Sequence, residues 1–291
     1  MQIIHSPEEM QAAARRLTSE GKEIAFVPTM GYLHEGHLSL LRAGRKAGDI
    51  LVLSIFVNPL QFGEGEDLSV YPRDLDCDRE LACSRGTDIV FSPSVKGLYP
   101  DGFSTCVEVK GLTEILCGHS RPNHFRGVTT VVCKLLNLVC PSKAFFGQKD
   151  YQQLTVIRRM VSDLNMGVEI VSMPIVREPD GLAMSSRNVY LDPNERRQAL
   201  SLVESILLAR AMYKEGERRA EEILDRVRTR IEMEPSAKVD YAQICHRDTL
   251  KEMDLLTEES MLLLAAYVGQ VRLIDNHQLG MELGKNDPQN A

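Results

Sequence analysis

Apolar and amphipathic segments alternate along the first 178 residues. Apolar runs predict strands at 23–31, 49–59, 88–93, 143–147 and 168–176. The segments between them have helical spacing, which predicts helices over 5–22, 37–48, 73–86, 127–141 and 150–166. The run at 49–59 is apolar almost throughout, as expected of a central strand in a parallel sheet. Strands that alternate with helices predict a right-handed parallel α/β sheet.

The first predicted helix has a well-marked start. Ser6 is placed to be the N-cap, and Pro7 suits the first helical position. Glu9 lies three residues after Ser6, the spacing of a capping box. We therefore expect this helix to begin at Pro7.

The pattern changes after residue 178. Residues 193–233 predict two charged amphipathic helices, and three strands follow at 239–246, 261–269 and 271–279. The terminal segment 284–291 is expected to be frayed. The predicted fold is therefore a Rossmann-like parallel-sheet domain at 1–178, followed by a smaller α+β lid domain at 179–291.

Composition narrows the function classes. The 291 residues carry a net charge of −7, which disfavours a broad surface for nucleic acid or anionic membrane. The cysteine count is 7, which is odd, and no pair has C-x-x-C spacing, so reduced thiols in a cytoplasm are expected. The N-terminus does not resemble a signal peptide, and no apolar run approaches the length of a membrane span.

The segment "MGYLHEGH", residues 30–37, is the first candidate site. His34 and His37 are three residues apart, which is not the H-E-x-x-H spacing of a zinc protease. They could hold a metal, satisfy a core or bind an anion. Because the segment joins a strand to a helix through Gly31, the helix N-terminus favours phosphate binding.

Two other nucleotide-binding motifs are missing from the sequence. No G-x-x-x-x-G-K-[ST] occurs, which excludes a P-loop enzyme. "GEGEDL" at 63–68 is not the G-x-G-x-x-G that joins strand and helix in dinucleotide-binding proteins. The sequence therefore lacks the glycine motif that dinucleotide-dependent hydride-transfer enzymes use.

Two further loops carry polyphosphate-binding side chains. In the polar loop 177–191, the hydroxyls of Ser185 and Ser186 and the fork of Arg187 could clamp phosphate, unless the loop only connects two domains. At the end of the strand 143–147, Lys149 could reach a phosphate. Asp150 could contact a ribose hydroxyl or simply cap the next helix.

The loop that follows the strand 49–59 suits a different ligand. Asn58 and Gln61 could bind a small hydroxylated acid. Asp74, Asp76 and Asp78 offer carboxylates for magnesium, or they only complement the dipole of the helix they begin.

Six motifs follow one another along the chain: "PTMGYLHEGHLSL", "FVNPLQF", "YPRDLDCD", "RPNHFRGV", "FFGQKDYQQL" and "REPDGLAMSSRN". In this order they resemble the pantoate–β-alanine ligase (pantothenate synthetase) family, within the nucleotidyltransferase and class I aminoacyl-tRNA synthetase-like superfamily. The resemblance is dense over residues 24–192. It implies that pantoate is activated by ATP and Mg²⁺ to pantoyl adenylate and pyrophosphate. The amine of β-alanine then attacks, which releases AMP and pantothenate.

The resemblance also implies residue roles and partners. Catalysis would fall to His34, His37, Lys149 and Arg187. The residues implied to bind ATP are Met30, His34, His37, Gly147, Lys149, Asp150, Val176, Met184, Ser185, Ser186 and Arg187. Those implied to hold or line the pantoate site are Gln61, Gln153, Tyr71 and Arg121, with Asp78 as the contact for Mg²⁺. The implied partners are small molecules only, with a homodimer as the expected assembly.

Two other functions are weighed against this one. Another adenylyl-transferring enzyme of the superfamily would share the histidines and the serine loop, but it need not share Gln61 and Gln153. A non-catalytic nucleotide-binding protein would bind ATP without releasing pyrophosphate.

Overall fold

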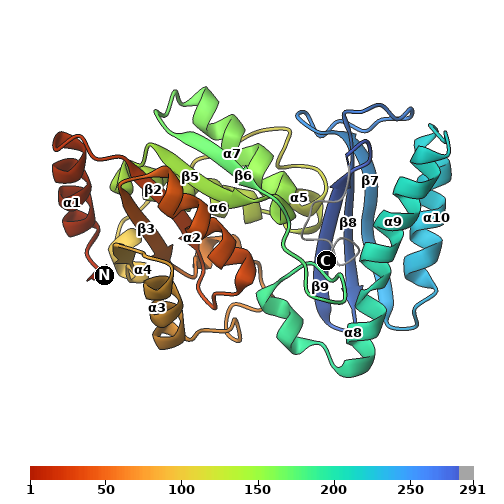
Figure 1. The fold of residues 1–291 in the computed structure, drawn as a ribbon, viewed down its shortest axis with the longest axis horizontal. Coiled ribbons are helices and arrows are strands. Elements are labelled where there is room, and N and C mark those ends of the chain that lie inside the picture. Colours follow the sequence, from red (N-terminus) through yellow and green to blue (C-terminus); the bar gives the residue numbers. More distant parts are fainter. Residues whose placement is uncertain (282–291) are drawn as a thin grey trace. The chain divides into compact units, whose positions relative to one another are not determined.

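The computed structural model describes residues 1–281 as two compact units (Figure 1). The first comprises Met1–Gln148 and Gln152–Met173, and the second comprises Lys149–Tyr151 and the chain from Pro174 onward. The short segment Lys149–Tyr151 thus groups with the second unit, although it lies within the sequence of the first. The segment 284–291, expected to be frayed, lies outside the described residues.

The first unit contains a parallel sheet of six strands in the order β1-β4-β3-β2-β5-β6. Its strands are β1 (Gln2–Ile4), β2 (Ile24–Thr29), β3 (Ile50–Ile55), β4 (Ile89–Phe91), β5 (Lys143–Gly147) and β6 (Glu169–Met173). The prediction of a parallel α/β domain is confirmed. Strand β1 was not predicted, because a run of three residues is too short to show a period.

Helices connect the strands of this sheet. The longer ones are α1 (Pro7–Ser19), α2 (Glu35–Ala47), α3 (Leu75–Ser84), α6 (His124–Val139) and α7 (Tyr151–Asp163). Shorter pieces are α4 (Val95–Leu98), α5 (Cys117–Ser120) and the 3₁₀ turns η1 (Pro59–Gln61) and η2 (Gln148–Asp150). Leu41 of α2 and Leu51 and Leu53 of β3 are fully buried in one core cluster, so helix and sheet share an apolar interior.

The start of α1 agrees with its sequence in part. The Ser6 hydroxyl accepts the backbone N–H of Glu9 at 3.2 Å, and Pro7 is the first helical residue. A capping box would also have the Glu9 side chain accept the backbone N–H of Ser6, and this second hydrogen bond is not formed. Instead the Ser6 hydroxyl donates to Oε2 of Glu8 at 2.6 Å, which lowers the pKa of Glu8. Ser6 therefore caps the helix as predicted, while the partner carboxylate is the neighbour of the predicted one.

The second unit is a small α+β structure. Its antiparallel sheet has the order β7-β8-β9, with β7 (Ala237–His246), β8 (Ser260–Val268) and β9 (Val271–Gln278). Its helices are α8 (Pro193–Ala199), α9 (Ser201–Lys214) and α10 (Ala220–Glu232), with the 3₁₀ turn η3 (Ser186–Tyr190) before them. Ile206, Ile223 and Leu264 are fully buried in a core cluster formed by these helices and the sheet. The three strands were predicted, and so was the small α+β class.

The helical part of this unit corrects one prediction. Residues 193–233 form three helices instead of two, because the first predicted helix is interrupted at Leu200. Leu200 is at once the C-cap of α8 and the N-cap of α9. Nothing in its apolar side chain predicts a break, so periodicity could not reveal it. Within residues 1–281, no helix is both long and apolar enough to cross a membrane.

Candidate active site

The two histidines lie at the N-terminus of α2, where a turn at Gly31 (φ +83°) links β2 to the helix. His34 is the N-cap, and its Nδ1 accepts the backbone N–H of Gly36 at 3.1 Å. Nδ1 of His37 accepts the backbone N–H of His34 at 3.3 Å, which completes a capping box made of two imidazoles. The ring centroids are 4.1 Å apart.

These hydrogen bonds determine what the rings can bind. When Nδ1 accepts a backbone N–H, the neutral imidazole carries its proton on Nε2. An Nε2–H group donates to a phosphate oxygen, but it cannot ligate a metal without losing that proton. The positive end of the α2 dipole also favours an anion here. The geometry therefore supports phosphate over metal as the ligand of His34 and His37.

Asp78, in the first turn of α3, holds the loop that leads to these histidines. Its side chain is buried, and its carboxylate accepts the backbone N–H groups of Tyr32 at 2.8 Å and Leu33 at 2.6 Å. Burial raises the pKa of Asp78, and these two hydrogen bonds oppose that rise. A Cβ on Gly31 would lie 2.8 Å from Oδ2 of Asp78, so only glycine fits there. Asp78 is predicted as a contact for Mg²⁺, and its hydrogen bonds to Tyr32 and Leu33 are an additional role that the sequence does not reveal.

A second polar cluster surrounds Gln61, which ends the 3₁₀ turn after β3. Its Oε1 accepts from Nδ2 of Asn58 at 3.1 Å, and its Nε2 lies 3.1 Å from the sulfur of Met30. Asn58 is buried, and its Oδ1 accepts the hydroxyl of Tyr99 at 2.8 Å. Burial raises the pKa of Tyr99, so its hydroxyl stays protonated and can donate. Two predicted residues, Met30 and Gln61, thus meet, and Tyr99 supports them without having been predicted.

Arg121 lies beside the same turn. Its guanidinium forms a bidentate pair with Glu66, at 2.8 Å and 2.5 Å, and donates to the backbone carbonyl of Gln61 at 3.3 Å. Burial alone would raise the pKa of Glu66, but the hydrogen bond and charge of Arg121 lower it overall. Tyr71, also predicted at the site, is buried with its ring edge-on to Phe62. Hydrogen bonds, an ion pair and an aromatic contact therefore restrain the loop around Gln61.

The neighbouring glutamines of α7 have different tasks. Gln152 is buried, and its amide accepts the N–H of Cys117 at 3.0 Å and donates to the carbonyls of Leu112 and Ile115 at 2.8 Å each. It fastens the segment 112–117 to α7. Gln153 is the next residue around the helix and is partly exposed, so it suits a ligand better than Gln152.

Within the second unit, the serine loop has a defined shape. The N–H of Met184 donates to the carbonyl of Val176 at 3.0 Å, which brings these two predicted residues together. The Ser185 hydroxyl caps η3 by accepting the N–H of Arg187 at 3.3 Å. Ser186 is buried. Lys149 belongs to the same unit, and the exposed Asp150 follows it in η2.

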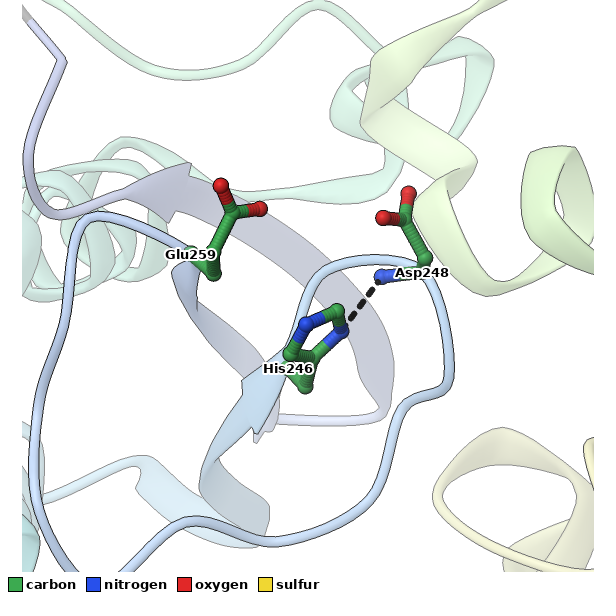
Figure 2. A group of neighbouring side chains, drawn as sticks. All are labelled: His246, Asp248 and Glu259. Atoms are coloured by element: carbon green, nitrogen blue, oxygen red, sulfur yellow. Dashed lines mark hydrogen bonds between the residues drawn. The ribbon is translucent and has the colours of Figure 1, made fainter.

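One group elsewhere has a composition that suggests a metal. His246, Asp248 and Glu259 lie around the turn between β7 and β8, with potential ligand atoms within 4.8 Å of one another (Figure 2). Nδ1 of His246 accepts the backbone N–H of Asp248 at 3.2 Å, and Nε of Arg247 lies 2.5 Å from the carboxylate of Glu259. The charge of Arg247 thus partly offsets that of Glu259, and we assign no metal to this group.

Comparison with known proteins decides the family. The model of the family described as pantoate–β-alanine ligase matches residues 2–278. The chain belongs to the pantoate–β-alanine ligase family. Like its family it is a ligase that forms a carbon–nitrogen bond, and the prediction made from the six motifs is confirmed.

Individual relatives agree with this assignment. The chain is 56% identical to the pantothenate synthetase of Syntrophotalea carbinolica, over 96% of this chain and 99% of that protein. It is 54% identical to that of Geobacter sulfurreducens, over 97% of this chain and 100% of that protein. The crystal structure of pantothenate synthetase from Thermus thermophilus matches with a TM-score of 0.91 and 45% identity, over 96% of this chain and 99% of that one.

A further solved structure contains ligands. The pantoate–β-alanine ligase of Francisella tularensis, complexed with β,γ-ATP and β-alanine, matches with a TM-score of 0.80 and 34% identity. The match covers 98% of this chain and 100% of that one. The individual site residues predicted for the present chain stay predictions, with the geometry described above as their support.

Proposed function

We propose that the protein condenses pantoate with β-alanine through a pantoyl-adenylate intermediate, at the expense of ATP. A carboxylate oxygen of pantoate attacks the α-phosphorus of ATP, and pyrophosphate leaves. The nitrogen of β-alanine then attacks the acyl carbon, AMP leaves, and the amine proton passes to water. The observation that carries the proposal is the pair His34 and His37, whose Nδ1 atoms cap α2 and leave the proton on Nε2.

The first step is the transfer of an adenylyl group at the α-phosphorus. As in phosphoryl transfer, positioning and charge stabilisation dominate its catalysis. His34 and His37 donate to phosphate oxygens at the N-terminus of α2, where the helix dipole adds to their effect. In the second unit, Lys149 and Arg187 supply positive charge, and the hydroxyls of Ser185 and Ser186 donate to phosphate. The remaining residues proposed for the nucleotide are Met30, Gly147, Asp150, Val176 and Met184.

Mg²⁺ is proposed as the cation that accompanies ATP and neutralises its phosphates. The carboxylates of α3 do not form a cage for it: Asp74 caps the helix, Asp76 is exposed beside Arg79, and Asp78 accepts two backbone N–H groups. Magnesium commonly keeps one or two carboxylates together with substrate phosphates. Asp78 is therefore proposed as at most a single contact, and its two hydrogen bonds give it the additional task of positioning the loop.

Pantoate is proposed to bind between the amides of Gln61 and Gln153, with Tyr71 and Arg121 lining the site. Gln61 is pre-oriented by Asn58, which restricts the amide before the ligand arrives. The proposed setting is the cytoplasm and the proposed assembly is a homodimer. The family resemblance supports both, and light scattering would test the assembly.

A single assay tests the reaction. The purified protein is given ATP, magnesium and pantoate, and the release of pyrophosphate and AMP is followed with and without β-alanine. We expect AMP release that requires both pantoate and β-alanine. A protein that hydrolyses ATP regardless of pantoate, or that adenylates a different acid, would refute the assignment.

The two glutamines allow the acid site to be separated from the nucleotide site. Gln61→Ala and Gln153→Ala should each raise the KM for pantoate by roughly tenfold, as expected for one lost ligand hydrogen bond, and change the KM for ATP little. Initial rates measured with each substrate varied in turn give both constants. Equal increases in the two KM values would assign these residues to something other than pantoate.

A further inference from the structure

Building on the proposed ATP site, we propose that Asn276 of β9 is a positioning residue for Lys149. Asn276 is 4% exposed, and its Nδ2 donates to the backbone carbonyl of Lys149 at 2.8 Å. The two residues are separated by 127 positions in the sequence, yet both belong to the second unit. The bond constrains the backbone from which the lysine side chain extends.

The anchoring side chain is itself held firmly. The backbone N–H of Asn276 donates to Oδ1 of Asp275 at 2.8 Å. Asp275 in turn receives both terminal nitrogens of Arg177, at 2.7 Å and 2.9 Å, and the side chains of this pair are only 5% and 2% exposed. A buried bidentate pair has one preferred geometry. Asn276 therefore presents its amide from a rigid part of the sheet.

The same cluster also reaches the serine loop. Arg177 donates to the carbonyl of Gly181 at 3.1 Å and pairs across the loop with Ala183. One buried group on β9, Asp275 with Asn276, thus supports two segments that carry proposed phosphate-binding residues. The first segment is η2 with Lys149, and the second is the loop that contains Ser185 and Arg187.

The local chain around Lys149 explains why an anchor is needed. A Cβ on Gly147, two residues earlier, would meet no atom within 4 Å, so no side chain packs against that position. A lysine side chain is flexible, and holding its backbone lowers the entropy that is lost when the side chain binds phosphate. Loss of the Asn276 bond should therefore weaken ATP binding and leave pantoate binding intact, because Gln61 and Gln153 lie in the first unit.

The test compares two variants on the same strand. Asn276→Ala removes the amide that bonds to Lys149. Gln278→Ala removes an amide that donates to a different backbone carbonyl, that of Glu258, at 2.7 Å. We expect Asn276→Ala to raise the KM for ATP about tenfold, the effect of one hydrogen bond, with the KM for pantoate unchanged. Gln278→Ala should leave both constants unchanged.

Asn276→Asp provides a second variant of nearly the same shape. Its carboxylate has no N–H to donate to Lys149, so the same rise in the KM for ATP is expected. A variant that merely unfolds in part would lose active protein without changing either KM. The inference is overturned if both Asn276 variants keep the KM for ATP within twofold of the unaltered protein, or if both KM values rise together. If the unaltered protein makes no AMP from pantoate and β-alanine, the proposed function fails instead.

Discussion

His37→Ala is expected to lower the rate of pyrophosphate release by about 10²-fold or more, the scale for loss of a group that stabilises transition-state charge. The ring of His37 carries its proton on Nε2, because Nδ1 accepts the N–H of His34. Removing the ring removes a donor that acts at the N-terminus of α2, where an anion is favoured. Single-turnover measurement of pyrophosphate with ATP and pantoate isolates the adenylation step.

The control for this prediction uses the capping role of the neighbouring histidine. Asparagine is a good N-cap, so His34→Asn keeps an acceptor for the N–H of Gly36 and loses only the imidazole. We expect His34→Asn to retain its thermal stability and still lose adenylation rate. His5→Ala, which changes an exposed histidine bonded to Ser92, should be fully active. Near-normal pyrophosphate release by both site variants would show that the histidines only cap the helix.

Much of the fold could be predicted because its signals are local. Burial of a whole strand makes it apolar throughout, as in β3, and a helix with one buried side shows the period of α2. The break at Leu200 and the short strand β1 escaped prediction for the opposite reason. A break without proline or glycine has no mark in the sequence, and β1 exists only because its backbone pairs with β4.

The candidate site likewise contains features that a local motif indicates and features that depend on long-range contacts. His34 and the serine loop stand out in the sequence as candidates because each is a compact motif at a strand or helix end. The side chains that hold the loops before His34 and around Gln61 could not be predicted, because Asp78 lies 45 residues from Leu33 and Tyr99 lies 41 residues from Asn58. Such contacts depend on how the strands are ordered, and no local period encodes that. The contacts that Asp78 makes with the loop and that Tyr99 makes with Asn58 became evident only in the tertiary structure.

The buried pair Arg177–Asp275 carries the largest expected effect on stability. Asp275→Ala should lower the free energy of unfolding by about 3–5 kcal/mol, because it leaves the Arg177 guanidinium charged and without its partner carboxylate in a side chain only 5% exposed. The measurement is urea unfolding followed by far-UV circular dichroism, since the chain has no tryptophan to report fluorescence.

A second ion pair in the same sheet provides the comparison. Arg272 and Asp240 join β9 and β7 at 2.7 Å, but their side chains are 15% and 16% exposed. Water can therefore solvate the arginine that remains after Asp240→Ala, and the expected loss is smaller than for Asp275→Ala. Replacing both members of the buried pair, as Arg177→Met with Asp275→Leu, should recover much of the lost stability, because no uncompensated charge remains. Both Asp275→Ala and this double replacement should raise the KM for ATP, because each removes the carboxylate that accepts the backbone N–H of Asn276. Equal losses from the two aspartate variants would mean that burial does not set the strength of the Arg177–Asp275 pair.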